Sequence, residues 1–254
     1  MSIVLVDTPN PGVGRIALNR ADKRNALSVE LREALLEALH ALSADADIRA
    51  IVIVGAGGNF CAGGDLASLS DITPAAGRQR IQRGHEVVRV MLNSEKPIVC
   101  AVEGYAMGAG AGLAMAADTA VVDSKSVIGF PFLKVGLGPD FGVSFLLPRR
   151  VGPARARQLL LRAQDIRGAD LITAGLADEL AADGEVQVRA IAIAAQYAAL
   201  PRLALALSKR QLRLFPQDFD AAAELEAGSQ ALCFGGDEFR EGVAAFRDKR
   251  RPQF

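Results

Sequence analysis

An apolar strand, a glycine-rich turn and a helix-like stretch follow one another twice in this chain of 254 residues. The apolar segment 51–54 ends at Gly-Ala-Gly-Gly, and the apolar segment 98–102 leads into a run rich in Gly and Ala that reaches residue 117. Strands that are apolar at every position need cover on both faces, as parallel strands with helical crossovers have. The repeated unit therefore predicts an α/β fold.

The other segments are consistent with this class. Alternating residues at 3–7 and 13–18, separated by Pro-Asn-Pro-Gly, predict a hairpin, and Ser28 is placed to cap a helix. Further patterns predict a helix over 78–92 and a strand over 120–123, and beyond Pro153 they are helical almost throughout, in the segments 154–163, 169–174, 186–200, 203–214, 219–233 and 238–249. Since Pro201 interrupts this series, we expect an α/β core over 1–200 and a helical region over 201–254.

Composition excludes several classes of protein. Lys and Arg number 29, as do Asp and Glu, so binding to nucleic acid or a membrane surface by bulk charge is not expected. Three cysteines without a CxxC pair and two histidines predict neither a disulfide framework nor a metal site. The beginning of the chain does not have the pattern of a signal peptide, and Glu103 interrupts its longest apolar stretch. These features predict a cytoplasmic protein.

Two glycine-rich segments, 59–66 and 104–112, offer a chemical function. Each is expected to open a helix, where backbone N–H groups are free to donate. Two such donors at one point form an oxyanion hole, which stabilises an enolate. The simpler interpretation is that glycine only permits a tight turn. A dinucleotide site is weakly supported, because Leu113 stands where GxGxxG needs its last glycine, and no P-loop motif is present.

Taken in order, the motifs resemble those of the crotonase superfamily of enoyl-CoA hydratases and isomerases. They are LNRADKRNALS at 18–28, NFCAGGDL at 59–66, KPIVCAVEGYAMGAGAGLAMAAD at 96–118, a Pro-Asp-Phe-Gly turn at 139–142 and EGVAAFRDKRRPQF at 241–254. The resemblance covers essentially the whole chain. It implies a crotonase-like spiral of ββα repeats with a helical C-terminal trimerisation region. It also implies an acyl-CoA thioester substrate, a homotrimer or dimer of trimers, and no cofactor other than the CoA carried by the substrate.

The resemblance assigns roles to single residues. The oxyanion donors would be the N–H groups of Gly64 and Ala109. The positions expected to border CoA are Lys23, Arg24, Ala26, Ala62, Asp65 and Leu66, with Phe246 and Lys249 reaching the CoA of a neighbouring subunit. Without the family pattern, the two lysines would be taken as solvated surface residues. An apolar acyl pocket is suggested by four residues, each of which could equally belong to the core: Phe130, Phe132, Leu137 and Phe141.

The departures from the family decide the predicted reaction. Family hydratases use two glutamates to activate water, and this chain has Gly112 and Phe132 at the matching positions. Asp140 resembles the single catalytic aspartate of the isomerase branch that includes the ring-epoxide and enoyl-CoA isomerases of phenylacetate catabolism. We therefore expect an enoyl-CoA isomerase with Asp140 as acid and base. The alternatives are an enoyl-CoA hydratase and a non-catalytic relative that binds RNA or CoA. Asp140 itself could instead be only the cap of a helix over 141–147.

The remaining polar residues have simpler interpretations. Glu103 and Asp118 are expected to be hydrogen-bonded structural groups, His85 a surface or packing residue, and Cys61 no nucleophile. The RNA-binding alternative rests on a run of basic residues: Arg149, Arg150, Arg155, Arg157, Arg162 and Arg167. Zero net charge and few aromatic residues favour interpreting this run as a solvated face instead. Dehalogenation through a nucleophilic aspartate is disfavoured, because the family branch that does this typically uses a tryptophan N–H and the chain has no Trp.

Overall fold

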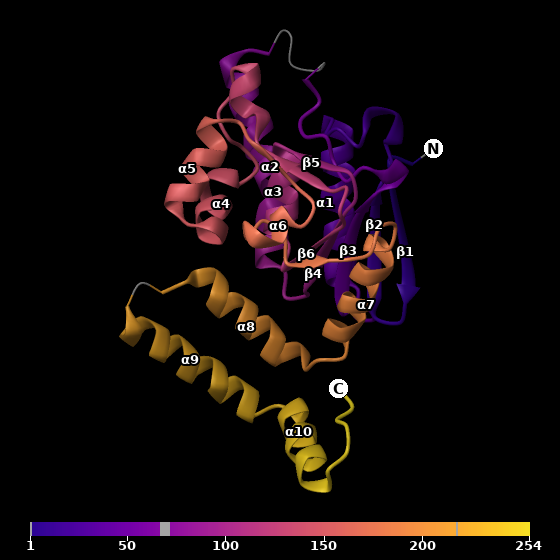
Figure 1. The fold of residues 1–254 in the computed structure, drawn as a ribbon. Coiled ribbons are helices and arrows are strands. Elements are labelled where there is room, and N and C mark those ends of the chain that lie inside the picture. Colours follow the sequence, from indigo (N-terminus) through magenta and orange to yellow (C-terminus); the bar gives the residue numbers. More distant parts are fainter. Residues whose placement is uncertain (1, 67–71, 217) are drawn as a thin grey trace.

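In the computed structural model, which describes residues 2–66, 72–216 and 218–254, the chain begins with the predicted hairpin (Figure 1). Strand β1 (Val4–Asn10) pairs antiparallel with β2 (Val13–Leu18). From β2 onward the sheet is parallel and adds, in spatial order, β3 (Ala50–Gly55), β4 (Ile98–Val102), β6 (Thr119–Val122) and β9 (Glu179–Leu180). The two apolar strands recognised in the sequence are therefore neighbours inside a six-stranded sheet.

A second, three-stranded sheet consists of β5 (Tyr105–Met107), β7 (Val127–Gly129) and β8 (Asp165–Arg167). β5 pairs parallel with β7, which pairs antiparallel with β8. These strands and β9 were not predicted from the sequence, because two or three residues are too few to show an alternating pattern. β8 and β9 lie between the segments predicted to be helical after Pro153.

Helices cover both faces of the larger sheet (Figure 1). The helices packed with its main core are α1 (Val29–Ala44), α2 (Pro74–Asn93), α3 (Ala109–Ala116), α4 (Val143–Val151), α5 (Pro153–Leu161) and the short α6 (Asp170–Thr173). The opposite face is covered by α7 (Val186–Ala198). In β3, Ile51 and Ile53 point into the main core while Val52 and Val54 pack with α7, so both faces are apolar for the predicted reason.

The predicted cap of α1 is confirmed, because the Ser28 hydroxyl accepts the backbone N–H of Leu31 at 3.2 Å. The predicted break at Pro201 coincides with a bend of 110° between α7 and α8 (Arg202–Leu214). Although this bent pair has enough length and apolar character together, none of the described helices is by itself long and apolar enough to cross a membrane.

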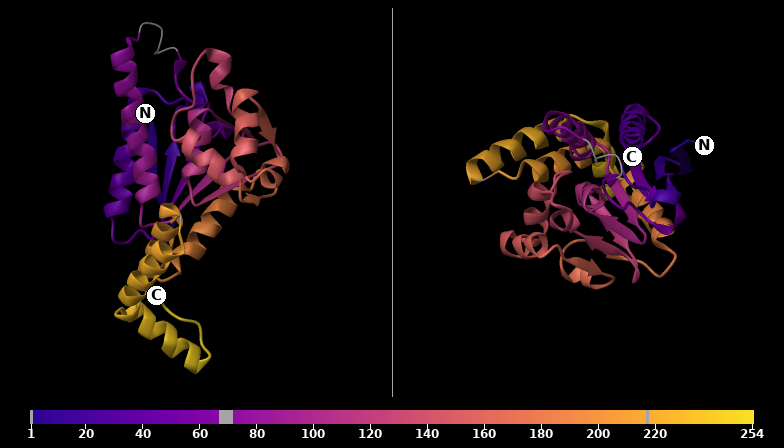
Figure 2. Two further views of the ribbon diagram at one scale, coloured as in Figure 1. Left: turned by 90° about the vertical axis from the view of Figure 1, so that its left-hand side faces the viewer. Right: turned by 90° about the horizontal axis from the view of Figure 1, so that it is seen from above.

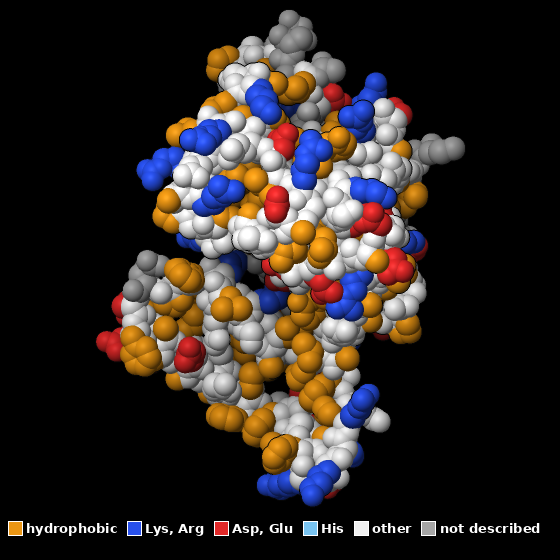
Figure 3. Space-filling view, viewed as in Figure 1, with side chains coloured by type: hydrophobic (Ala, Val, Ile, Leu, Met, Phe, Trp, Pro, Cys, Tyr) orange, Lys and Arg blue, Asp and Glu red, His pale blue; other side chains and the backbone are white. Residues whose placement is uncertain are grey.

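The last helices, α9 (Phe219–Phe234) and α10 (Asp237–Asp248), extend away from the α/β body (Figure 2). No residue of α8 is fully buried, and hydrophobic side chains gather on the surface along the C-terminal helices (Figure 3). The exposed apolar side chains here include Leu212, Phe219, Leu232, Phe234 and Phe246. A single chain therefore leaves these apolar side chains largely uncovered.

Candidate active site

Most of the predicted site residues line one cavity of about 630 Å³. Its wall comes from α2, the beginning of α3, the 3₁₀ turn Pro131–Val135 and the loop before α4. The predicted residues that it brings together are Ala62, Gly64, Leu66, Ala109, Phe132, Leu137, Asp140 and Phe141. Ala62 and Phe141, which are 79 positions apart in the sequence, therefore line the same cavity, as the family motifs led us to expect.

The two expected oxyanion donors come from segments that lie side by side. The Cys61 N–H donates to the Tyr105 carbonyl at 2.8 Å, and the Met107 N–H donates to the Cys61 carbonyl at 2.9 Å. Ala109 is the first residue of α3, so the helix supplies no acceptor for its N–H. Within the described structure the Gly64 N–H likewise donates no hydrogen bond. Two unused backbone donors therefore line the same cavity.

Glycine is required at two places in this arrangement. Gly63 has a φ of +96°, and a Cβ there would lie 2.6 Å from the Met107 carbonyl oxygen. Gly108, which precedes α3, has a φ of +54° with a ψ of −112°, a conformation that residues with a Cβ rarely adopt. The glycines do permit tight turns, as the simpler interpretation held. The same turns place the free N–H groups at the cavity.

Asp140 does not cap a helix. α4 begins at Val143, and its cap residue is Gly142, which makes no side-chain capping bond. The alternative interpretation, a helix over 141–147 capped by Asp140, is therefore wrong, because the positive φ of Phe141 and Gly142 delays the start of the helix. The Asp140 backbone carbonyl accepts the Val143 N–H at 2.9 Å.

The carboxylate of Asp140 is held in an unusual environment. Its Oδ1 is buried and has no hydrogen-bond partner within the described structure. Burial raises the pKa of Asp140 above that of an ordinary aspartate, while the charges of His85 and Arg32 act in the opposite direction. A buried carboxylate with an unused oxygen beside a cavity can accept a proton from a bound molecule.

Phe141 fixes the position of this carboxylate. Its ring is buried against α2 at Gly84, where a Cβ would lie 2.6 Å from the ring. Its carbonyl oxygen packs against α3 at Gly112, where a Cβ would lie 2.5 Å from that oxygen. The residue after Asp140 is thus anchored between two helices.

Neither of the positions that match the two family glutamates has an acidic residue, and one of them has no space for a side chain. A side chain at Gly112 would collide with the Phe141 backbone. Phe132 is 7% exposed and forms an apolar part of the cavity wall. Among the described residues that line the cavity, Asp140 is the only carboxylic acid.

The segment expected to border CoA lies beside this cavity. Ala62 N–H donates to the Arg24 carbonyl at 2.9 Å, and the guanidinium of Arg24 lies over the Tyr105 ring, 5.9 Å from its centroid. Lys23 is exposed, Ala26 is half-buried, and neither lines the cavity. Asp65 forms an ion pair with Arg20 at 2.6 Å, which ties the two segments together.

Asn25, within this segment, has a structural role that was not predicted from the sequence. It is fully buried, and its side-chain amide donates to the carbonyls of Ala56 and Asn59 at 3.0 and 2.7 Å. Its oxygen accepts the Arg20 N–H at 2.9 Å. The available signal was an asparagine in a tight loop, since asparagine tolerates the positive φ observed here.

Three predicted residues lie elsewhere. Phe130 is fully buried in the main core and does not line the cavity, so its assignment to the acyl pocket is wrong. Phe246 is in α10 and 86% exposed, and Lys249 directly follows that helix. Both lie in the C-terminal region, away from the cavity of their own chain (Figure 1). Their contact with the CoA of a neighbouring subunit stays a prediction.

The proximity of Arg32 and His85 to Asp140 was also not predicted from the sequence. The pattern of α1 identified its apolar positions, yet Arg32 on that helix is 7% exposed and lines the cavity. His85 is half-buried on α2, and its charge is the strongest of those that lower the pKa of Asp140. No single-sequence pattern marks either residue, because their importance comes from the packing of α1 and α2 against the loop at 139–142.

The structural hydrogen bonds predicted for Glu103 and Asp118 are confirmed. Glu103 accepts a hydrogen bond from Gln187 at 2.7 Å, and Asp118 accepts the Ile98 N–H at 2.7 Å. Burial raises the pKa of the Cys61 thiol to about 12, so it is not a nucleophile at neutral pH. In the basic run, Arg150 pairs with Asp178 at 3.1 Å.

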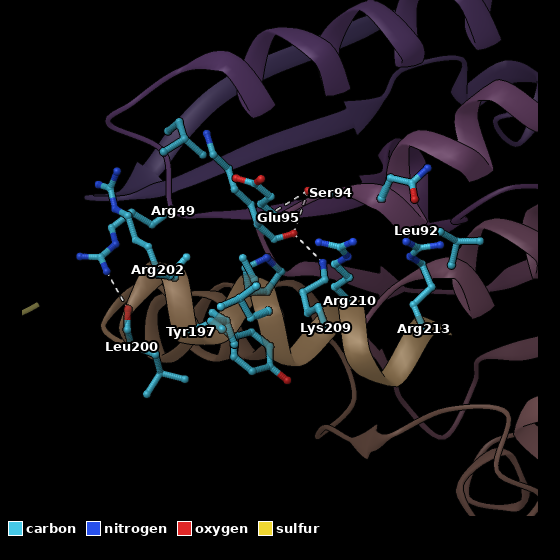
Figure 4. Close-up of a pocket in the computed structure, with 18 residues that line it drawn as sticks. Arg49, Leu92, Ser94, Glu95, Tyr197, Leu200, Arg202, Lys209, Arg210 and Arg213 are labelled. Atoms are coloured by element: carbon cyan, nitrogen blue, oxygen red, sulfur yellow. Dashed lines mark hydrogen bonds between the residues drawn. The ribbon is translucent and has the colours of Figure 1, made fainter. Parts of the chain in front are cut away.

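A second cavity, of about 440 Å³, separates α8 from the body and contains none of the predicted site residues (Figure 4). Arg49, Arg202, Lys209, Arg210 and Arg213 are among its walls. Lys209 donates to the Lys96 carbonyl at 2.7 Å and pairs with Asp118 at 2.7 Å. These contacts attach α8 to the body rather than form a reaction centre.

Comparison with known proteins identifies the family of this chain. Residues 8–254 match the model of the enoyl-CoA hydratase/isomerase family. A crotonyl-CoA hydratase of Syntrophomonas wolfei is 33% identical over 93% of this chain and 92% of its own length. A 1,2-epoxyphenylacetyl-CoA isomerase of Escherichia coli is 34% identical over 96% and 95%. The crystal structure of an enoyl-CoA hydratase from Polaromonas sp. JS666 is 32% identical, covers 98% of both chains and superposes with a TM-score of 0.94. An enoyl-CoA hydratase structure from Bacillus anthracis gives a TM-score of 0.95 at 26% identity, over 100% of this chain and 99% of that one. The chain is therefore an enzyme of the enoyl-CoA hydratase/isomerase family with the crotonase fold.

Proposed function

We propose that this enzyme is an enoyl-CoA isomerase that shifts a double bond, or a ring bond, with Asp140 as both base and acid. The observation that carries the proposal is the set of acids at the cavity. Asp140 is the one carboxylate that lines its described part, while the backbone of Phe141 occupies the space at Gly112. Two water-activating glutamates have no place in this arrangement.

The chemistry needs only groups that line the cavity. With a 3-enoyl-CoA bound, Asp140 removes a proton from the carbon next to the thioester, and the electrons move onto the thioester oxygen. The N–H groups of Gly64 and Ala109 stabilise that oxyanion. Asp140 then returns the proton at the far end of the dienolate, so the double bond moves into conjugation and the carboxylate is regenerated. The buried environment favours this cycle, because it stabilises the protonated form of Asp140.

Hydratase activity is the second candidate, and the name of the relative from Syntrophomonas wolfei favours it. Rates with two substrates separate the candidates. Conversion of 3-hexenoyl-CoA to 2-hexenoyl-CoA, followed by the absorbance of the conjugated thioester, is expected to be at least a hundredfold faster than hydration of crotonyl-CoA. Equal or faster hydration would refute the isomerase proposal.

We also propose that the chain assembles as a homotrimer or a dimer of trimers through its C-terminal helices. The exposed apolar side chains of α8, α9 and α10 support this, since a monomer rarely exposes so large an apolar surface. Light scattering during gel filtration gives the mass directly. A monomeric mass at micromolar concentration would refute the assembly.

A further inference from the structure

Arg32 is a buried cation beside the cavity whose hydrogen bonds are incomplete. It is 7% exposed, on the first turn of α1. Its Nε donates to the Ser28 carbonyl at 3.1 Å, and its Nη1 donates to the Arg80 carbonyl at 3.2 Å. A guanidinium has five N–H groups, so three remain without an acceptor in the described structure. No nitrogen of Arg32 is among the fully buried atoms that lack a partner in the described structure, so its remaining N–H groups are open to the cavity or to solvent.

No carboxylate of the described residues forms an ion pair with Arg32. Asp140 acts on its charge, yet the two groups do not come within the 4.0 Å of an ion pair. Burial lowers the pKa of Arg32 to about 10, which still leaves it positively charged at neutral pH. Across the described cavity wall, the charged groups are Arg32, Arg78 and Arg80 against Asp140. The other lining residues of the cavity are mostly apolar.

The cavity does not end at Arg32. A groove of about 480 Å³ between α1 and α2 lies on the other side of this side chain and shares Arg32, Ile72 and Arg80 with the cavity. A molecule that enters beside Gly64 and Ala109 therefore meets Arg32 within the cavity, with open space beyond it. The bond to the Arg80 carbonyl joins α1 to α2, so a structural role is present, but the two carbonyl bonds together use only two of the five donors of Arg32.

We propose that Arg32 binds a carboxylate at the distal end of the acyl group, so that the preferred substrates are CoA thioesters of dicarboxylic acids. Guanidinium groups bind carboxylates through paired N–H donors, and burial strengthens that interaction relative to water. The apolar residues of the cavity accommodate the intervening carbons. This inference rests on the proposed function, because it takes the cavity to be the acyl site.

Binding of saturated acyl-CoAs to the whole enzyme tests the inference without catalysis. Calorimetry compares succinyl-, glutaryl- and adipoyl-CoA with butyryl-, pentanoyl- and hexanoyl-CoA, each pair having the same number of acyl carbons. We expect one of the dicarboxylic thioesters to bind about 10- to 100-fold more tightly than its monocarboxylic counterpart. If all the pairs bind equally, the inference is refuted and the proposed function is untouched. If no acyl-CoA binds, the proposed function is refuted and the inference with it.

Variants locate the source of the preference. Arg32→Met keeps the length of the side chain and removes the charge, so the preference for the dicarboxylic thioester is expected to vanish. Arg32→Lys keeps the charge without the paired donors and is expected to retain part of it. Arg89→Met is the matched control, because Arg89 lies on the exposed side of α2 and pairs with Glu86. An unchanged preference in Arg32→Met would overturn the assignment, as would an equal loss of affinity for both members of a pair with a shifted pH profile, since Arg32 would then act on Asp140.

Discussion

Replacing Gly112 by alanine tests whether the backbone of Phe141 excludes the first hydratase glutamate. The new Cβ would lie 2.5 Å from the Phe141 carbonyl oxygen and 2.8 Å from its Cβ, where ordinary contacts begin at 3.4 Å. The 139–142 loop would have to move by roughly 1 Å, and overpacking of this kind costs about 1–3 kcal/mol of folding free energy. For a chain of this size, that corresponds to a decrease in Tm of about 2–12 °C.

The same movement displaces Asp140, which precedes Phe141, so we expect isomerase turnover to fall about a hundredfold. Gly112→Glu should lose at least as much and gain no hydration of crotonyl-CoA. Gly228→Ala is the matched control, because a Cβ at this position of α9 meets nothing within 4 Å. Thermal melting and the two substrate assays measure all three variants. Hydratase activity in a stable Gly112→Glu protein would refute the steric argument.

Four further outcomes are expected. Gly64→Pro, which removes one oxyanion donor, should lower kcat by about 10²–10³, and full activity in the folded variant would exclude that donor. Because burial raises the pKa of Asp140, isomerase activity should be lost as the pH falls toward the raised pKa, at a pH above the ordinary value of 3.8, whereas an acid limb at or below 3.8 would contradict the burial effect. For the same reason ionisation of Asp140 costs the folded state stability as the pH rises through that pKa, so Asp140→Asn should be at least as stable as the parent at neutral pH and should lose this advantage below the ordinary value. Lys209→Met leaves the carboxylate of Asp118 without its ion-pair partner and should cost about 1–3 kcal/mol, measured by urea unfolding; an unchanged midpoint would mean that water replaces the lysine.

The sequence predicted the longer elements because their apolar patterns are extended. β3 and β4 are fully apolar, and the cap at Ser28 marks the beginning of α1. The strands of the second sheet were missed, since each has three residues and is defined by its neighbours. Pairing of this kind depends on contacts between distant segments, which local patterns do not contain.

The same distinction applies to the residues of the site: those marked by local motifs could be predicted, and those defined by packing could not. Gly64 and Ala109 could be assigned because a backbone donor at a helix start is a local feature that the family motifs mark. Phe130 was assigned wrongly, because alternate residues of one segment point into the cavity and into the core, and the sequence does not distinguish the two sides. Arg32 could not be found, since its burial results from the packing of α1 against α2.

The most direct test of the central claim is proton exchange by Asp140→Asn. The wild-type enzyme, incubated with a 3-enoyl-CoA in deuterated water, is expected to move the double bond and to incorporate deuterium next to the thioester or at the far end of the dienolate. The Asp140→Asn protein should fold, bind the same thioester, and lose both isomerisation and exchange by about 10²–10⁴. Isomerisation and exchange at the wild-type rate in Asp140→Asn would contradict the account, because another group would then carry the proton.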